Sequence, residues 1–109
     1  MKKQYNDKEE LLARYSKALG HPARVMIVKF LAAQSECYFG DLHEILPLTK
    51  ATVSQHLSEL KDAGLIQGTF EPPKMRYCIN QTNWKFAKEL FEELFQSYNP
   101  KQTTNCCEK

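Results

Sequence analysis

The sequence predicts a mainly α-helical domain with one β-hairpin, and three observations carry that prediction. Apolar residues recur at helical spacing in several stretches, and glycine or proline ends most of those stretches. Two short runs rich in β-forming residues flank a Pro-Pro pair. A chain of 109 residues, 42% of them apolar, has room for one modest core. We therefore expect one domain over residues 1–99 and a flexible, cysteine-containing tail over residues 100–109.

The first two helices are predicted from their ends. Asn6 or Asp7 can cap the first helix, and Gly20 ends it. Pro22 suits the first turn of a second helix, which we expect to reach about Gln34. Apolar residues within both segments lie at spacings that would place them on a buried face.

A pair of helices follows, separated by a short turn. After an extended piece over residues 36–39, "GDLHEILP" predicts a brief third helix closed by Pro47. Thr49 then caps a fourth helix, which ends at Gly64, a residue suited to a left-handed stop. Two helices joined in this way are typical of a helix-turn-helix.

The rest of the chain predicts a hairpin and a last helix. "LIQGTF" and "MRYCIN" are two strand-like runs joined by "EPPK", and the prolines would be tolerated only at an exposed tip. A helix over residues 82–98 has a wide apolar face. The fold class that we expect is therefore an α+β winged helix-turn-helix, with five helices and a two-stranded wing.

The outer face of the fourth helix indicates what it contacts. Thr52, Ser54, Gln55 and Ser58 cover one side, where a helix built only for solubility would use Glu and Lys. Small polar side chains can approach base edges and phosphates closely, and Gln pairs with adenine. Together with the basic residues beside the hairpin tip, this face predicts DNA binding.

Charge and composition limit the other function classes. The net charge is +2, and no apolar run approaches the length of a membrane span. The Lys-Lys pair at the N-terminus is not followed by an apolar run, so we expect no signal peptide and a cytoplasmic location with reduced thiols. Because the chain shows no nucleophile–base pair or phosphate loop, we expect neither an enzyme nor an organic cofactor.

Four segments resemble the ArsR/SmtB winged-helix repressors: "ALGHPARVMIVKFL", "GDLHEIL", "TKATVSQHLSELKDAGLI" and "KMRYCIN". The resemblance covers about residues 15–98. It implies a homodimer built on the first and last helices, which binds two half-sites of an inverted repeat and releases double-stranded DNA when it binds a metal or metalloid. The apolar last helix agrees with a dimer, because a domain this small has little core in which to bury it.

The resemblance also implies DNA-contacting residues. Most of the expected set lies on the fourth helix and the rest in the wing: Lys50, Thr52, Ser54, Gln55, His56, Ser58, Lys74 and Arg76. His56 lies toward the core edge of the helical wheel, so a half-buried role is as well supported as base reading. We expect His21 to be a cap or packing residue and His43 to be solvated.

The sensor site departs from the family pattern. Many relatives bind arsenic through a Cys-x-Cys pair just before the third helix, whereas Tyr38 and Gly40 occupy those positions here. Others bind zinc through histidines on the last helix, which has none in this sequence. We expect Cys106 and Cys107, with Cys37 as the third sulfur, to bind As(III) or Sb(III), because soft thiolates select soft ions.

Three alternatives remain open from the sequence. Cys78 competes with Cys37 as the third sulfur, although a small, half-buried strand residue is the simpler interpretation. A thiol redox or persulfide switch could use the same cysteines as the metalloid site. A winged-helix module that binds proteins and no DNA is the alternative from another class. We expect no disulfide framework in a reducing compartment.

Overall fold

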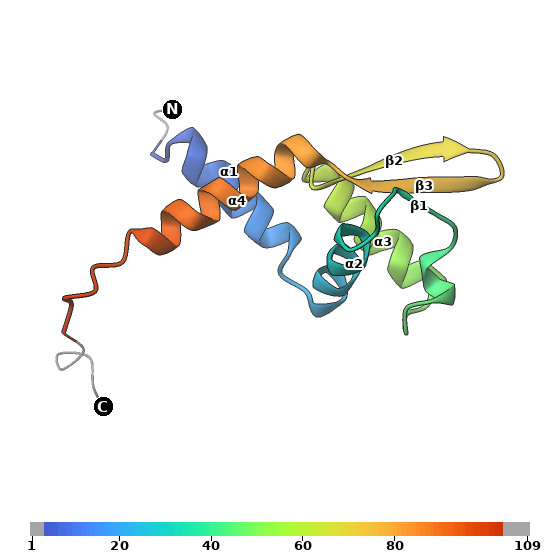
Figure 1. The fold of residues 1–109 in the computed structure, drawn as a ribbon, viewed down its shortest axis with the longest axis horizontal. Helices are drawn as coiled ribbons and strands as arrows, with labels where there is room; N and C mark the ends of the chain where they lie inside the picture. The colour runs from blue at the N-terminus through green and yellow to red at the C-terminus, as the bar shows by residue number, and fades with distance from the viewer. Residues whose placement is uncertain (1–3, 104–109) are drawn as a thin grey trace.

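The computed structural model describes residues 4–103 and shows a winged helix-turn-helix (Figure 1). Within that part of the chain it has four α-helices, one 3-10 turn and one antiparallel sheet of three strands. In chain order the elements are α1 (Asp7–Ala18), α2 (Pro22–Ala32), β1 (Tyr38–Phe39), η1 (Leu42–Glu44), α3 (Lys50–Asp62), β2 (Ile66–Glu71), β3 (Lys74–Ile79) and α4 (Gln81–Gln96).

The predicted winged helix-turn-helix is confirmed, and the structure differs from it in the following details. The expected third helix is the single 3-10 turn η1, because Pro47 follows too closely for a longer helix. The extended piece before it is the strand β1, which pairs with β3 and makes the sheet three-stranded in the order β1-β3-β2. Two helix ends also lie two residues earlier than expected, at Ala32 and Gln96.

The residues at the helix ends act as the sequence predicts. Asn6 caps α1 and forms a capping box with Glu9, and the Thr49 side chain accepts a hydrogen bond from the Thr52 backbone N–H. Gly64 has φ +86° after α3, a conformation that residues with a Cβ adopt at a cost. The Asn83 amide donates to the Gly64 carbonyl at 2.9 Å, which fixes the start of α4 against the end of α3.

The core lies where the helices meet the base of the sheet. Its largest fully buried side chains come from α1, α2, the end of α3 and the start of β2: Tyr15, Ile27, Leu60, Leu65 and Ile66. This packing holds α3 across α2, while the far part of the hairpin extends away from the helices (Figure 1). We call β2, β3 and their connecting turn, residues 66–79, the wing.

The outer end of α4 remains apolar and uncovered. Leu94 and Phe95 in its last turn are exposed, Phe95 by 70%, and so is Tyr98 just beyond the helix; Phe86, near the start of α4, is exposed as well. Helix α4 packs against α1 on one side only (Figure 1). Among the described residues, no helix combines the length and the hydropathy required to cross a membrane.

Candidate nucleic-acid interface and thiol pair

Helix α3 presents two chemically different faces. Val53, Leu57 and Leu60 are buried in the core. The opposite face carries most of the residues predicted to contact DNA, and these are exposed: Lys50, Ser54, Gln55 and Ser58. Thr52 is half-buried, and its hydroxyl is hydrogen-bonded to that of Thr49 at 2.8 Å. The polar side of α3 is therefore free to approach a ligand, and we call α3 the recognition helix.

His56 does not belong to that exposed face. Its side chain is only 7% exposed and lies 4.5 Å from the His21 ring, measured between centroids. The Arg24 Nε–H donates to His56 Nδ1 at 3.0 Å. Burial above all, then the positive charges of His21 and Arg24, lowers the pKa of His56 below its ordinary value. This placement corrects the assignment of His56 as a DNA contact, because a buried neutral imidazole serves packing.

His21 has the structural role that was expected of it. It is the N-cap of α2, and its Nδ1 accepts a hydrogen bond from the Ala23 backbone N–H at 3.0 Å. Sequence reasoning missed Arg24, which binds His56 and also the last carbonyls of α1. A charged residue among the apolar positions of α2 was the available signal.

The wing places one of its two predicted basic contacts, Lys74, beside the recognition helix, whereas Arg76 lines a different hollow next to Cys37 and Cys78. One surface groove is lined by Lys50 and Ser54 of α3 and by Lys74 at the tip of the wing. Ser54 and Ser58 also line an adjoining hollow. The structure thus brings four of the predicted DNA contacts to one continuous surface.

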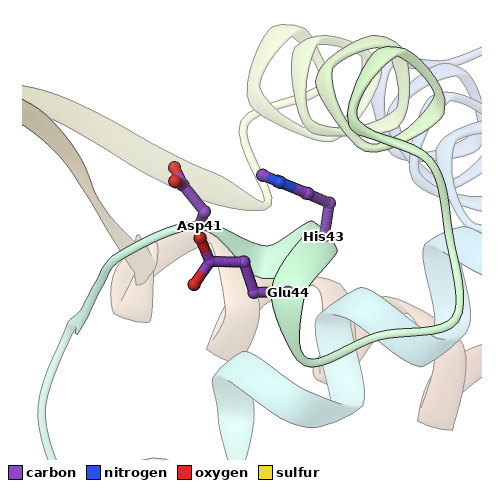
Figure 2. Close-up of side chains that lie close together, drawn as sticks. All are labelled: Asp41, His43 and Glu44. Atoms are coloured by element: carbon purple, nitrogen blue, oxygen red, sulfur yellow. The ribbon is translucent and has the colours of Figure 1, made fainter.

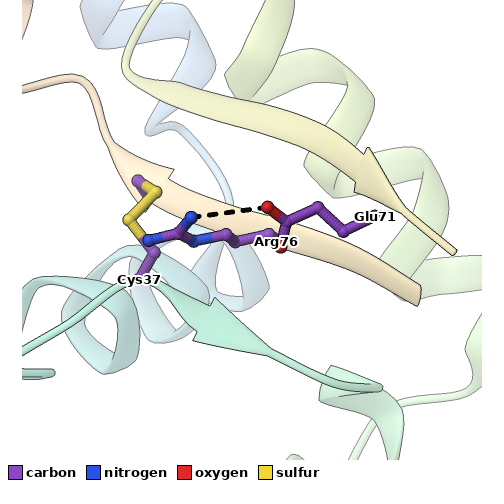
Figure 3. Close-up of a disulfide and its surroundings, with 4 residues drawn as sticks. Cys37, Glu71 and Arg76 are labelled. Carbon is purple, nitrogen blue, oxygen red and sulfur yellow. Dashed lines mark ion pairs between the residues drawn. A yellow bond between two sulfur atoms is a disulfide. The ribbon is translucent and has the colours of Figure 1, made fainter. Parts of the chain in front are cut away.

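Arg76 lies on the wing but is already paired. Its guanidinium forms an ion pair with Glu71 across the hairpin at 3.5 Å, and both side chains are about half exposed (Figure 3). Exposed pairs of this kind contribute little to stability, about 0–1 kcal/mol. A phosphate could therefore replace Glu71 as the partner of Arg76 at small cost.

The structure joins Cys37 to Cys78 in a disulfide (Figure 3). This corrects the expectation of no disulfide framework. It also shows that Cys78 has a bonded partner, where a small, half-buried strand residue was expected. The two Cα atoms are 4.5 Å apart. A signal was present in the sequence, since Cys37-Tyr38 and Tyr77-Cys78 are mirror images that antiparallel strands bring into register.

Cys106 and Cys107 lie outside the described residues, so the structure neither brings them to Cys37 nor separates them from it.

A second group of chemically active side chains surrounds the turn η1. Single ligand atoms of Asp41, His43 and Glu44 all lie within 4.8 Å of one another (Figure 2). His43 is half-buried here, not simply solvated. Burial, and after it the negative charge of Asp41, raises the pKa of Tyr77. Carboxylates and one imidazole on a surface turn are common without an ion, so we assign no metal to this group.

Recognition helix, groove and wing together define a winged helix-turn-helix protein. The sequence profile of the family described as "Bacterial regulatory protein, arsR family" matches residues 21–67. The chain is 33% identical over 88 residues to the uncharacterized HTH-type transcriptional regulator MJ1325 of Methanocaldococcus jannaschii. The 88 residues are 81% of this chain and 99% of that protein. The chain belongs to the ArsR family, which is described as one of bacterial regulatory proteins, in agreement with the expectation of a regulator and not an enzyme.

Two further proteins are similar to it. The HTH-type transcriptional regulator CmtR of Mycobacterium tuberculosis is 40% identical over 72 residues, 66% of this chain and 60% of CmtR. The solution structure described as the cadmium metal-sensor CmtR superposes with a TM-score of 0.55 at 33% identity, over 84% of this chain and 94% of that one. An ArsR-like regulator from Rhodococcus sp. RHA1 has the same fold, with a TM-score of 0.71 at 19% identity over 84% and 86%.

Proposed function

We propose that the chain is a homodimeric transcriptional repressor that binds operator DNA through the recognition helix and the wing. The observation that carries the proposal is the exposed polar face of Ser54, Gln55 and Ser58, from which Ser54 lines one groove together with Lys50 and Lys74. Side chains of this kind hydrogen-bond base edges in the major groove, and lysines neutralise phosphates beside it. Family membership supports the same assignment.

The dimer is proposed from the uncovered apolar surface of α4. Leu94 and Phe95 at the end of α4, and Tyr98 just after it, are large apolar residues, yet their side chains are exposed by 49–70%. A second copy of the chain that packed there would bury them and place two recognition helices in two-fold symmetry. Such a dimer binds an inverted repeat whose half-sites lie about one helical turn, or a multiple of it, apart.

Salt-dependent binding tests this proposal against a module that binds only proteins. Fluorescence anisotropy with a duplex bearing an inverted repeat selected from random sequence should show affinity that falls steeply with salt, since phosphate contacts release counterions. A scrambled duplex of equal length is the control. Failure to select any sequence, with equally weak binding to both duplexes, would overturn the repressor assignment.

The proposed inducer is As(III) or Sb(III), held by the thiolates of Cys37, Cys106 and Cys107. Cys37 directly precedes β1, which leads through Gly40 into η1, so a ligand there acts at the start of the helix-turn-helix. The similarity to a protein described as a cadmium metal-sensor supports a soft ion as the signal. Binding to the tail would favour a dimer shape that fits the operator less well, so ligand and DNA would weaken each other reciprocally.

The third sulfur is best supplied across the dimer. The described part of the tail leaves α4 at the end opposite to β3 (Figure 1). Antiparallel packing of α4 in two copies would place that end beside the start of the other α4, which follows Cys78 closely. Cys106 lies ten positions after Gln96, a span of at most about 33–36 Å when extended.

A second candidate signal is thiol oxidation, by a redox or persulfide reaction of the cysteines. The specific observation in its favour is the disulfide between Cys37 and Cys78. Titration of fully reduced protein with arsenite separates the two candidates. Growth of thiolate-to-arsenic absorbance, together with release of DNA without oxidation, supports the metalloid sensor. Release only after oxidation supports the second candidate.

A further inference from the structure

We propose that Cys37 and Cys78 form a reversible thiol–disulfide exchange site, which takes small disulfides and thiols as reactants and controls whether Cys37 can bind a metalloid. We call these two residues the thiol pair. The exchange chemistry stands on the structure of the pair, whereas the control of metalloid binding rests on the proposed function.

The strand register presents the thiol pair for bonding. Tyr38 is paired with Tyr77 and Phe39 with Arg76, so Cys37 and Cys78 continue the same antiparallel register by one position. A Cα separation of 4.5 Å is that of directly opposite residues whose side chains approach most closely, and it lies within the range of disulfides. The bond can therefore close without rearranging the backbone.

Small reactants can approach the thiol pair from the surface. Cys37 and Cys78 are half-buried and line an open hollow together with polar side chains, among them Glu36, Arg76 and Gln81. Arg76 lines the same hollow as both cysteines, and Figure 3 draws its guanidinium on the side of the disulfide. A cation next to a thiol stabilises the thiolate, which is the attacking species in exchange.

The reaction needs only a low-molecular-weight disulfide. One thiolate of the pair attacks a sulfur of the small disulfide, forms a mixed disulfide and expels one small thiolate. The second thiolate then attacks the protein sulfur of the mixed disulfide and expels the other small thiolate. Two protein thiols are oxidised, one small disulfide is reduced to two thiols, and the two protons leave with those thiols.

Closing the bond has two consequences for the regulator. β1 is held to β3 by only two residue pairs, so the disulfide adds a covalent link between the wing and the segment that leads into η1. It also uses the bonding capacity of the Cys37 sulfur, which can no longer act as a thiolate ligand. The oxidised protein should therefore remain on its operator when arsenite is present.

Thiol counting tests the exchange site. The full chain with Cys106→Ser and Cys107→Ser is equilibrated in glutathione buffers of increasing oxidation, and its free thiols are then trapped with a maleimide. Both remaining thiols should be lost together. A peptide map should show that they have formed a bond within one chain. Dithiothreitol should restore both. Adding Cys78→Ser should instead leave one thiol that accumulates a mixed disulfide. If both thiols stay free throughout, or bond only between chains, the exchange site is overturned.

A second arm tests the control of metalloid binding. In wild-type protein, a buffer is chosen in which mapping shows the thiol pair bonded and the tail thiols still free. Arsenite should release the operator from fully reduced protein and leave it bound to this oxidised form, and dithiothreitol added to the oxidised form should restore release by arsenite. Release of the mapped oxidised form overturns the control. If the reduced protein is not released, the proposed inducer fails, and thiol counting still decides the exchange site.

Discussion

Arg24 donates a hydrogen bond from its Nε to Nδ1 of His56 at 3.0 Å, and this contact joins α2 to the inner face of the recognition helix. The acceptor nitrogen must be unprotonated for the bond to exist. The neighbouring imidazole of His21, 4.5 Å away between ring centroids, adds to the cost of charging His56. The contact that helps to orient α3, and with it the exposed polar face proposed to bind DNA, thus uses an unprotonated nitrogen of His56.

This contact predicts that the fold weakens in mild acid. The pKa of His56 is lowered by burial first, and then by His21 and Arg24, so the unfolded chain binds the proton more readily than the folded one. The stabilisation is fully present above the unfolded value of about 6.5 and is lost as the pH falls below it. Urea unfolding at a series of pH values from 8 to 5 should show that the free energy of unfolding falls with the pH. This dependence on pH should be weaker for His56→Asn. The same pH dependence of the free energy of unfolding in both proteins would contradict this account.

Base reading and phosphate binding should separate by mutation. Gln55→Ala should relax sequence preference, with a loss of about 1–3 kcal/mol of discrimination at one base pair. Lys74→Ala should weaken binding to all sequences alike and lower the salt slope by about one unit. Anisotropy with the operator and single-base variants, over a range of salt concentrations, measures both. Unchanged affinity and preference in Gln55→Ala would remove that residue from the interface.

The apolar end of α4 should control association. Phe95→Glu places a charge in the proposed dimer interface, where a buried Phe contributes about 1.5–3 kcal/mol in each copy. The dimer dissociation constant should rise at least tenfold, since about 1.4 kcal/mol is a factor of ten. Gln96→Glu, the same charge on the exposed neighbouring position, is the matched control. Sedimentation equilibrium measures both variants, and equal dissociation constants would place the interface elsewhere.

Local signals predicted most of the fold. Asn6, Thr49 and Gly64 determine helix ends through contacts within a few residues, and a single sequence displays such contacts. Residues 36–39 were expected to be extended, but the pairing of β1 with β3 was not predicted, because two residues carry no periodicity and their partners lie far along the chain. The run "GDLHEILP" was expected to be a brief helix closed by Pro47, and it forms only the 3-10 turn η1.

The candidate site was predictable where it depended on helical geometry alone. The exposed face of α3, with Ser54 and Gln55, follows from a wheel, whereas the burial of His56 required the position of Arg24 on another helix. The bond between Cys37 and Cys78 depends on a strand register that the sequence shows only once β1 is known to pair with β3.

The central claim is that thiolates of the tail, together with Cys37, convert a soft metalloid into release of DNA. Its most direct test is operator anisotropy with and without arsenite in reducing buffer, for the wild-type chain and for Cys106→Ser/Cys107→Ser. Both proteins should bind the operator equally well without arsenite, and only the wild type should be released, less completely at low pH because the ligands must lose protons. If the doubly substituted chain is still released by arsenite, the sensor site lies elsewhere and the account is contradicted.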